Sequence, residues 1–231
     1  VLSFLVNQKC SIWLSFIIVG YIITHFTLQQ TIFQYIWSFI LVVSFVFLAG
    51  GIGRIFSISQ ELPALTLIII QVLIGFGVLS LLTLFLGLFW KINATIISIK
   101  LIFGIILFSK SIILWIKSAL SSLKSTLIET SCFEIIIIIY LITIFLIQLL
   151  QSMAPPVKYD ALIYHLTLPK VYLMQEKISD IPWLVMSGMP QTTEMLYFDV
   201  MSVAGESAPL ILNWSFGLLT AIGLFSFLKE K

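Results

Sequence analysis

Charged residues are scarce in this 231-residue chain. Only 10% of the residues are Asp, Glu, Lys or Arg, whereas a typical soluble domain has about 25%. Apolar residues make up 60% of the chain, and the mean hydropathy is +1.16. The net charge of +2 is small, and no basic run with interleaved aromatic residues occurs. These values argue against nucleic-acid binding and indicate an integral membrane protein.

Cysteine and histidine are also rare, with two of each. Two cysteines give no disulfide framework, and His25 and His165 are too far apart in sequence to suggest a histidine metal site. The motifs G-x-x-x-x-G-K, H-E-x-x-H and G-x-S-x-G, which mark nucleotide loops, zinc sites and serine nucleophiles, are missing. No cofactor is therefore indicated with certainty, and a divalent cation stays open as an alternative.

Long apolar runs dominate the chain instead. A helix needs about 20 apolar residues to cross the hydrocarbon of a bilayer. Runs of about this length lie at 11–28, 31–49, 64–89, 93–116, 132–151 and 208–228. They predict an all-α fold, a polytopic bundle of about six transmembrane helices. Gly75, Gly77 and Gly87 predict close helix packing along the third run.

The runs divide the chain into three expected regions. Residues 1–151 form about five transmembrane helices, residues 152–207 a loop with short interfacial helices, and residues 208–231 a last transmembrane helix. The chain begins with Val and ends directly behind an apolar run. We therefore expect a piece of a longer chain that is truncated after this helix.

Basic residues in short loops predict the orientation, because such loops stay in the cytoplasm. If every run crosses the bilayer, one side receives nearly all of them: Lys9, Arg54, Lys110, Lys117, Lys124, Lys229 and Lys231. The other side's short loops hold only Lys91, so the loop over 152–207 is expected outside the cytoplasm. Lys100 falls within the fourth run. We expect it to snorkel to an interface or to serve packing, because no acidic residue lies within one helical turn.

The loop after Gln151 carries most of the candidate chemistry. From Asp160 the pattern DALIYHLTLPKVYLMQEK predicts an interfacial helix, which Pro169 kinks or divides. An acid, a phenol and an imidazole, those of Asp160, Tyr164 and His165, crowd neighbouring stripes of this helix. The alternative for Asp160 is that it caps the helix.

A second short helix is expected within QTTEMLYFDVMSVAGES, with Gly205 at its end and Pro209 at the start of the last apolar helix. Glu194 is expected on the turn that faces back to the first loop helix. Asp199 and Glu206 are expected to cap a helix or to meet solvent.

Three segments carry a resemblance to a known family: PPVKYDALIYHLTLPKVYL, MPQTTEMLY and AGESAPLILNWSFGLLTA. Here the chain resembles the polytopic GT-C type glycosyltransferases, in particular the bacterial members with a mannosyltransferase or RgtA/B/C/D-like domain. The resemblance implies a donor sugar on a polyprenyl phosphate, an acceptor glycan, lipid or protein of the cell envelope, and a location in the bacterial inner (cytoplasmic) membrane. It also implies a catalytic acid in the first large extracytoplasmic loop, which Asp160 matches. The family completes its lipid pocket with later helices, so we expect this piece to be inactive alone.

The residues of the loop suit this chemistry. A carboxylate can act as general base on an acceptor hydroxyl, and a departing lipid phosphate needs cations or hydrogen-bond donors nearby. Asp160 is thus the candidate base, and Tyr164, His165, Lys170 and Glu194 are candidate substrate- or phosphate-binding residues.

Four alternatives stay open. Lys170 can be a headgroup anchor, and His165 a hydrogen-bonded residue at the interface. The whole chain can be a transporter or flippase, for which Lys100 is the strongest intramembrane charge, although no internal repeat is visible. It can also be a non-catalytic membrane subunit that uses the loop as a docking surface.

Overall fold

The computed structural model describes residues 31–56, 62–128 and 131–229. Of these residues 83% are helical, and none forms a strand. The helices in chain order are Thr31–Gly53, α2 (Ala64–Phe89), α3 (Ala94–Leu107), α4 (Ser109–Ile128), α5 (Cys132–Ser152), α6 (Thr167–Gln175), α7 (Thr192–Ala204) and α8 (Ser207–Lys229). A π-helical turn, η1 (Ala161–His165), precedes α6, and a 3₁₀ turn, η2 (Val185–Gly188), precedes α7. The chain divides into two compact units, Val1–Trp37 and Ser38–Lys231, and the packing below belongs to the second.

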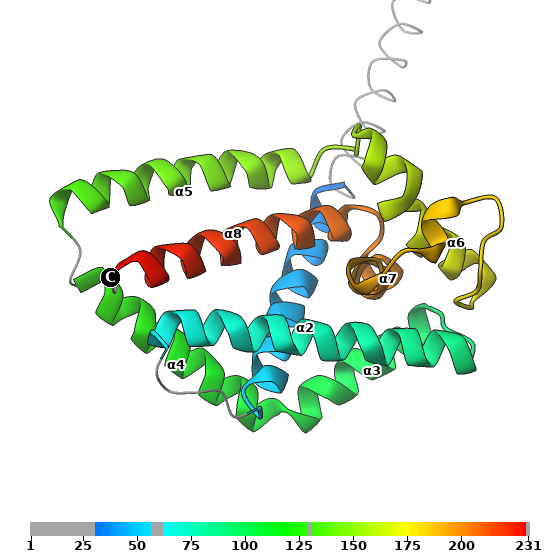
Figure 1. Ribbon diagram of the computed structural model, residues 1–231, viewed down its shortest axis with the longest axis horizontal. Helices are drawn as coiled ribbons and strands as arrows, with labels where there is room; N and C mark the ends of the chain where they lie inside the picture. The colour runs from blue at the N-terminus through cyan, green and yellow to red at the C-terminus, as the bar shows by residue number, and fades with distance from the viewer. Residues whose placement is uncertain (1–30, 57–61, 129–130, 230–231) are drawn as a thin grey trace, which may run out of the picture. The chain divides into compact units, whose positions relative to one another are not determined.

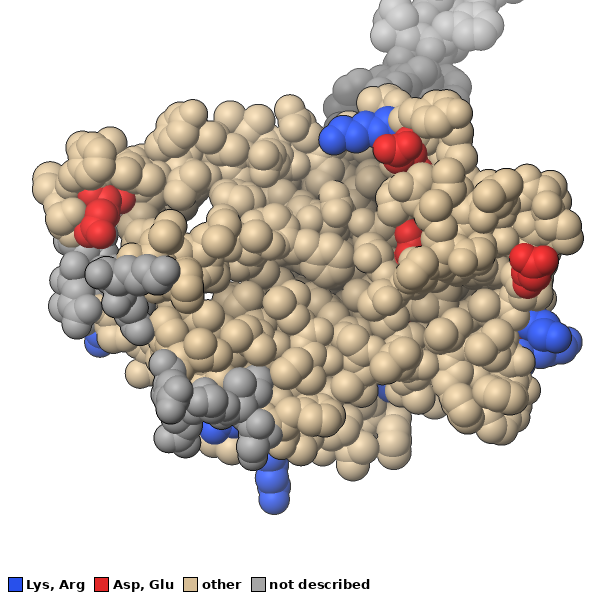
Figure 2. Space-filling model, viewed as in Figure 1, with Lys and Arg blue, Asp and Glu red and all other residues tan. Residues whose placement is uncertain are grey.

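Among the described residues, four helices are long and apolar enough to cross a membrane: Thr31–Gly53, Ala64–Phe89, Cys132–Ser152 and Ser207–Leu228. The all-α prediction is confirmed, and four of the predicted runs coincide with these helices. Figure 2 shows why the chain suits a bilayer, since apolar and uncharged atoms cover nearly the whole face, with a few charged side chains mostly toward its edges. The run predicted at 11–28 lies outside the described residues.

The fourth predicted run, 93–116, is not one straight helix. It breaks at Phe108 into α3 and α4, which meet at a bend of 71°. The bent pair adds a fifth candidate span only if the two helices cross the membrane together as one span. The two halves differ in character, because α3 has one lysine, one serine and one threonine whereas α4 carries three lysines and six serines. The bend therefore turns the more polar helix, α4, away from the axis of α3. The side of the membrane reached by residues 152–207 stays a prediction.

The helix ends follow local rules of capping. Asn93 accepts a hydrogen bond from the backbone of Ile96 and begins α3. Ser131 and Glu134 form a reciprocal capping box at the start of α5. Gly205, at φ 81°, ends α7 in a conformation that a residue with a side chain rarely adopts.

The core is organised around α7, which is buried on every side. All residues from Glu194 to Met201 are buried, and α7 contacts α2, α3, α6 and α8. Figure 1 shows α7 end-on, between α8, α2 and α6. In contrast, α5 packs beside α8 but buries none of its residues, so its apolar side chains are available to lipid.

Glycines let two of the helices approach closely. A Cβ atom on Gly75 of α2 would lie 1.9 Å from the carbonyl oxygen of Ala49, and one on Gly53 would lie 1.7 Å from the carbonyl oxygen of Gln71. The expected close approach of helices is confirmed for Gly75. At Gly87 a Cβ would instead meet the side chain of Ile178, in the segment after α6. The expectation is wrong for Gly77, because nothing lies within 4 Å of its Cβ position.

This difference gives a matched pair of variants. Gly75→Ala forces two backbones apart, so we expect it to lower the free energy of unfolding by about 1–3 kcal/mol. Gly77→Ala meets open space and gains up to about 1 kcal/mol from the higher helix propensity of alanine. Unfolding of the protein in mixed micelles by added SDS measures both values. Equal shifts in the two variants would contradict the close crossing at Gly75.

Candidate functional site

The candidate site begins where the chain leaves α5. Pro155 and Pro156 follow this helix, and Asp160 stands at the N-terminal end of the π-helical turn η1. The Asp160 side chain makes no capping hydrogen bond, so the alternative that it caps the helix is wrong. Its carboxylate is exposed and has no hydrogen bond or ion pair among the described residues.

The π-helical turn explains how Pro169 fits into this segment. Proline lacks an N–H and its ring collides with the carbonyl four residues earlier in a regular helix. Here the chain widens first, because the N–H of Leu166 donates to the carbonyl of Ala161 at 3.0 Å. The hydroxyl of Thr167 donates to the next carbonyl, that of Leu162. Pro169 then lies in the first turn of α6, where no intrahelical partner is needed. The helix is divided as expected, but the break falls at Leu166, and Pro169 itself lies within α6.

Glu194 and His165 form the polar contact at the end of this turn. The His165 Nδ1 atom lies 2.7 Å from Oε1 of Glu194. A carboxylate can only accept, so Nδ1 carries the proton in this contact and Nε2 is left for another partner. The His165 side chain keeps 38% of its surface exposed, whereas that of Glu194 keeps 7%. The expectation that Glu194 faces the first loop helix is confirmed.

The ring of Tyr164 lies against the imidazole of His165. Its ring centroid lies 4.0 Å from that of His165, at an interplanar angle of 43°. No hydrogen bond joins Asp160 to either ring among the described residues. The π-helical turn therefore places the free carboxylate at its start and the oriented imidazole at its end.

Lys170 pairs with Glu206 on the surface. The two side chains are more than half exposed, and Nζ donates to the Glu206 carboxylate. Glu206 meets solvent as expected and also holds this partner. An exposed pair is worth about 0–1 kcal/mol, so Lys170 can exchange Glu206 for a ligand anion at little cost.

A second charge cluster, missed from sequence, lies in the core. Lys100 of α3 contacts Oδ1 of Asp199 of α7 and the hydroxyl of Thr83 of α2, each at 2.6 Å. The Asp199 side chain is fully buried and Lys100 keeps 7% of its surface exposed. Snorkelling of Lys100 to an interface is therefore wrong, as is capping or solvent exposure of Asp199.

The physical reason is tertiary. The two residues are 99 positions apart, and helix packing joins them. Burial raises the pKa of the Asp199 carboxyl, while the ammonium of Lys100 and the hydroxyl of Thr83 oppose that rise. A signal was present in the sequence, since MLYFDVM places one acid inside an apolar stretch and the fourth run holds Lys100 among apolar residues.

A third set of polar contacts links α6 to the segment before α7. The Tyr172 hydroxyl donates to Oε1 of Gln191 at 2.9 Å, and Nε2 of Gln191 donates to the carbonyl of Ser187. Burial raises the pKa of the Tyr172 phenol, so this hydroxyl stays a hydrogen-bond donor at neutral pH. The contacts hold the 3₁₀ turn η2 against α6.

Within the described ranges, no three His, Cys, Asp or Glu side chains lie close enough to hold a metal ion. Comparison of the chain with protein-family models, curated proteins and solved structures gives no match. Function is therefore inferred from the residues and their geometry.

The two ion pairs differ in what their loss costs. Lys100→Met leaves Asp199 buried without its partner, so we expect the free energy of unfolding to fall by about 3–5 kcal/mol. Adding Asp199→Leu removes the second charge and restores much of that loss. Lys170→Met, at the exposed pair, lowers stability by less than about 1 kcal/mol.

SDS-induced unfolding in mixed micelles compares the three variants. Equal losses for Lys100→Met and Lys170→Met would contradict a buried, stabilising contact between Lys100 and Asp199. A double variant no more stable than Lys100→Met would show that Asp199 does not depend on that lysine.

Proposed function

We propose that this protein is a membrane glycosyltransferase that moves a sugar from a polyprenyl-phosphate donor to an acceptor on the outer side of the membrane. The observation that carries the proposal is the free, exposed carboxylate of Asp160 on the same π-helical turn as an imidazole oriented by Glu194. The segment that resembles the GT-C family, PPVKYDALIYHLTLPKVYL, includes this turn.

The proposed reaction assigns a role to each group. The acceptor hydroxyl oxygen attacks the anomeric carbon, and the bond from that carbon to the phosphate oxygen breaks. The bonding electrons leave with the lipid phosphate, and the hydroxyl proton passes to Asp160. The carboxylate is suited to this because no neighbouring side chain among the described residues occupies its lone pairs.

The leaving phosphate gains negative charge as the bond breaks, so it needs donors or cations. Nε2 of His165 is turned away from Glu194 and belongs to a partly exposed ring. When the ring is protonated, Nε2–H can donate to a phosphate oxygen. Lys170 supplies a second cation once its exposed contact with Glu206 opens.

The buried pair of Lys100 and Asp199 is the observation that favours a transporter, because intramembrane charges mark ion pathways in many membrane proteins. Here each charge is satisfied by the other and by Thr83. This arrangement is typical of a structural contact, so transport is the second candidate.

Asp160→Asn tests the general base. We expect sugar transfer to fall on the order of 10²–10⁴-fold, the usual contribution of general acid–base catalysis. The assay follows labelled sugar from a polyprenyl-phosphate hexose or pentose into membranes that contain the intact protein. Glu176→Gln, which neutralises another acid of the same region, is the matched control and keeps its activity. Unchanged transfer in Asp160→Asn would remove Asp160 from the mechanism. No transfer by the unaltered protein with any donor would favour transport or a docking subunit.

His165→Gln tests the phosphate contact separately. A hydrogen bond to a charged group contributes about 1.5–3 kcal/mol, so we expect binding of unglycosylated polyprenyl phosphate to weaken about 10- to 100-fold. Asp160→Asn leaves this binding unchanged, because the base does not touch the phosphate. Displacement of a fluorescent polyprenyl phosphate from the purified protein measures both. Equal weakening in the two variants would contradict the separate roles.

A further inference from the structure

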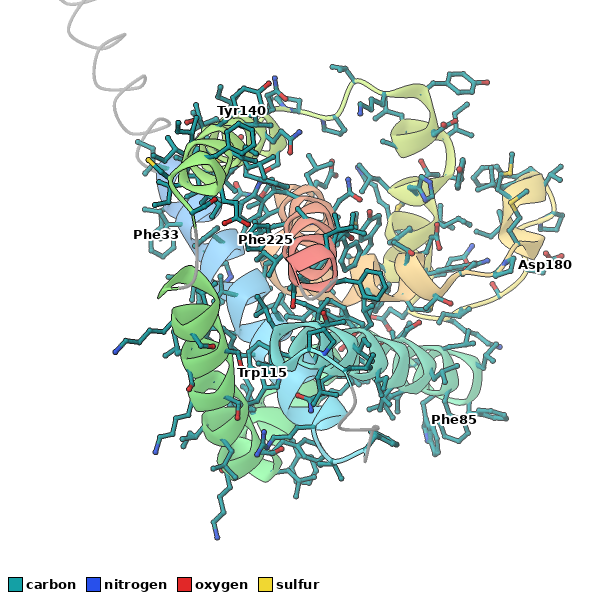
Figure 3. The ribbon with its side chains drawn as sticks, turned by 60° about the vertical axis from the view of Figure 1, so that its left-hand side comes forward. Phe33, Phe85, Trp115, Tyr140, Asp180 and Phe225 are labelled. Carbon is teal, nitrogen blue, oxygen red and sulfur yellow. The ribbon has the colours of Figure 1, made fainter. Side chains whose placement is uncertain are left out.

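A cleft lies between α2 and the segment that carries η2. Its volume is about 480 Å³. One wall comes from α2 and includes Leu81, Leu84 and Leu88. The other combines apolar residues such as Met189 with the polar groups of Asp180, Ser187 and Gln191, and is called the polar wall below. Figure 3 shows Asp180 on the loop beside η2 and Phe85 on α2, both projecting outward on the same side of the ribbon. The cleft is thus largely apolar, with most of its polar groups on the wall opposite α2.

The wall formed by α2 belongs to a candidate membrane span. Leu81, Leu84 and Leu88 follow one another at helical spacing on one face of Ala64–Phe89. Leu81 is 66% exposed and Leu88 is 48% exposed, which suits contact with acyl chains. Trp90 and Lys91 follow directly, and this pairing is typical of the boundary between hydrocarbon and headgroups.

Backbone hydrogen bonds attach the polar wall to this boundary. The N–H of Ile178 donates to the carbonyl of Gly87 at 3.0 Å, and the N–H of Ile92 donates to the carbonyl of Glu176 at 2.8 Å. The segment leading to Asp180 is therefore held at the end of α2. A lipid with its chains along the leucines would place its head group beside Asp180, Ser187 and Gln191.

The chemistry of the polar wall selects the kind of head group. No Lys, Arg or His is among the residues that line the cleft, so a phosphate would find no cation there. Asp180 is an exposed acid that would repel such an anion. Carboxylate, hydroxyl and amide groups instead pair with the hydroxyls of an uncharged head group.

The polar wall is also held in place. Ser187 donates to Oδ1 of Asp180 at 3.2 Å, and Gln191 connects the carbonyl of Ser187 to the hydroxyl of Tyr172. These contacts use one oxygen of Asp180 and leave the other for a ligand. Groups fixed before binding lose less freedom when the ligand arrives.

We propose that this cleft binds a membrane lipid with an uncharged, hydroxyl-rich head group, such as a glycosyl diacylglycerol. The site is separate from the phosphate contact proposed at His165 and Lys170. The inference does not rest on sugar transfer, because binding is measured without a donor. Its failure and the failure of the proposed transfer activity are therefore distinct results.

The first experiment measures head-group preference. A photoactivatable monoglucosyl diacylglycerol is crosslinked to the intact protein in nanodiscs, and phosphatidylglycerol or unlabelled monoglucosyl diacylglycerol with the same acyl chains competes. We expect the glucosyl lipid to compete at least about tenfold better, which corresponds to about 1.4 kcal/mol. Equal competition, or better competition by phosphatidylglycerol, overturns the proposal. This test uses the unaltered protein and so does not depend on the folding of a variant.

The second experiment uses variants of the two walls. Leu88→Trp fills the cleft and is expected to reduce crosslinking at least about fivefold, a change of about 1 kcal/mol. Leu82→Trp is the matched control, because Leu82 is also partly exposed on α2 but does not line the cleft. Asp180→Lys supplies a cation and is expected to shift the preference toward phosphatidylglycerol. Equal effects of the two Trp variants, or an unchanged preference in Asp180→Lys, overturns the proposed site.

Discussion

The contact of Lys100 with Asp199 and Thr83 is the interaction on which the rest of the structure depends. It joins α2, α3 and α7 at one buried point, and it allows a helix that carries an acid to lie in the middle of an apolar bundle. Glu194 is on that same helix and orients His165. The geometry at the surface therefore rests on a charge pair in the core.

Two kinds of polar environment lie on either side of α6. At its start are two groups suited to an anion. Glu194 orients the ring of His165, and Lys170 can exchange its exposed partner Glu206 for another anion. Farther along, Tyr172 belongs to a cleft whose lining has an acid and no base. One short helix of nine residues thus separates the surface proposed to bind a phosphate from the cleft proposed to take an uncharged head group. A membrane protein can use such a division to keep a phosphorylated lipid and an uncharged lipid in separate places.

The sequence predicted those features that are local. The ends of the helices Ala64–Phe89 and Cys132–Ser152 agree with the predicted runs to within one residue. A long apolar run predicts a membrane helix from its own residues alone, without knowledge of its partners. That Glu194 faces the first loop helix was expected from its turn, whereas its contact with His165 was not predicted. The break at Phe108 has no proline to announce it, and the partners Lys100 and Asp199 are joined by packing between distant segments. Such features depend on the whole fold, so short-range patterns do not reveal them.

The 99 residues between Lys100 and Asp199 set an order of events during synthesis. The ribosome delivers α3 before α7, and at about 5–20 residues per second the interval is on the order of 5–20 seconds. A lone lysine at the centre of a bilayer costs about 2.5–3.5 kcal/mol. Through that interval the charge of Lys100 lacks its counter-charge, and the contact that joins α2, α3 and α7 forms only after α7 has been made.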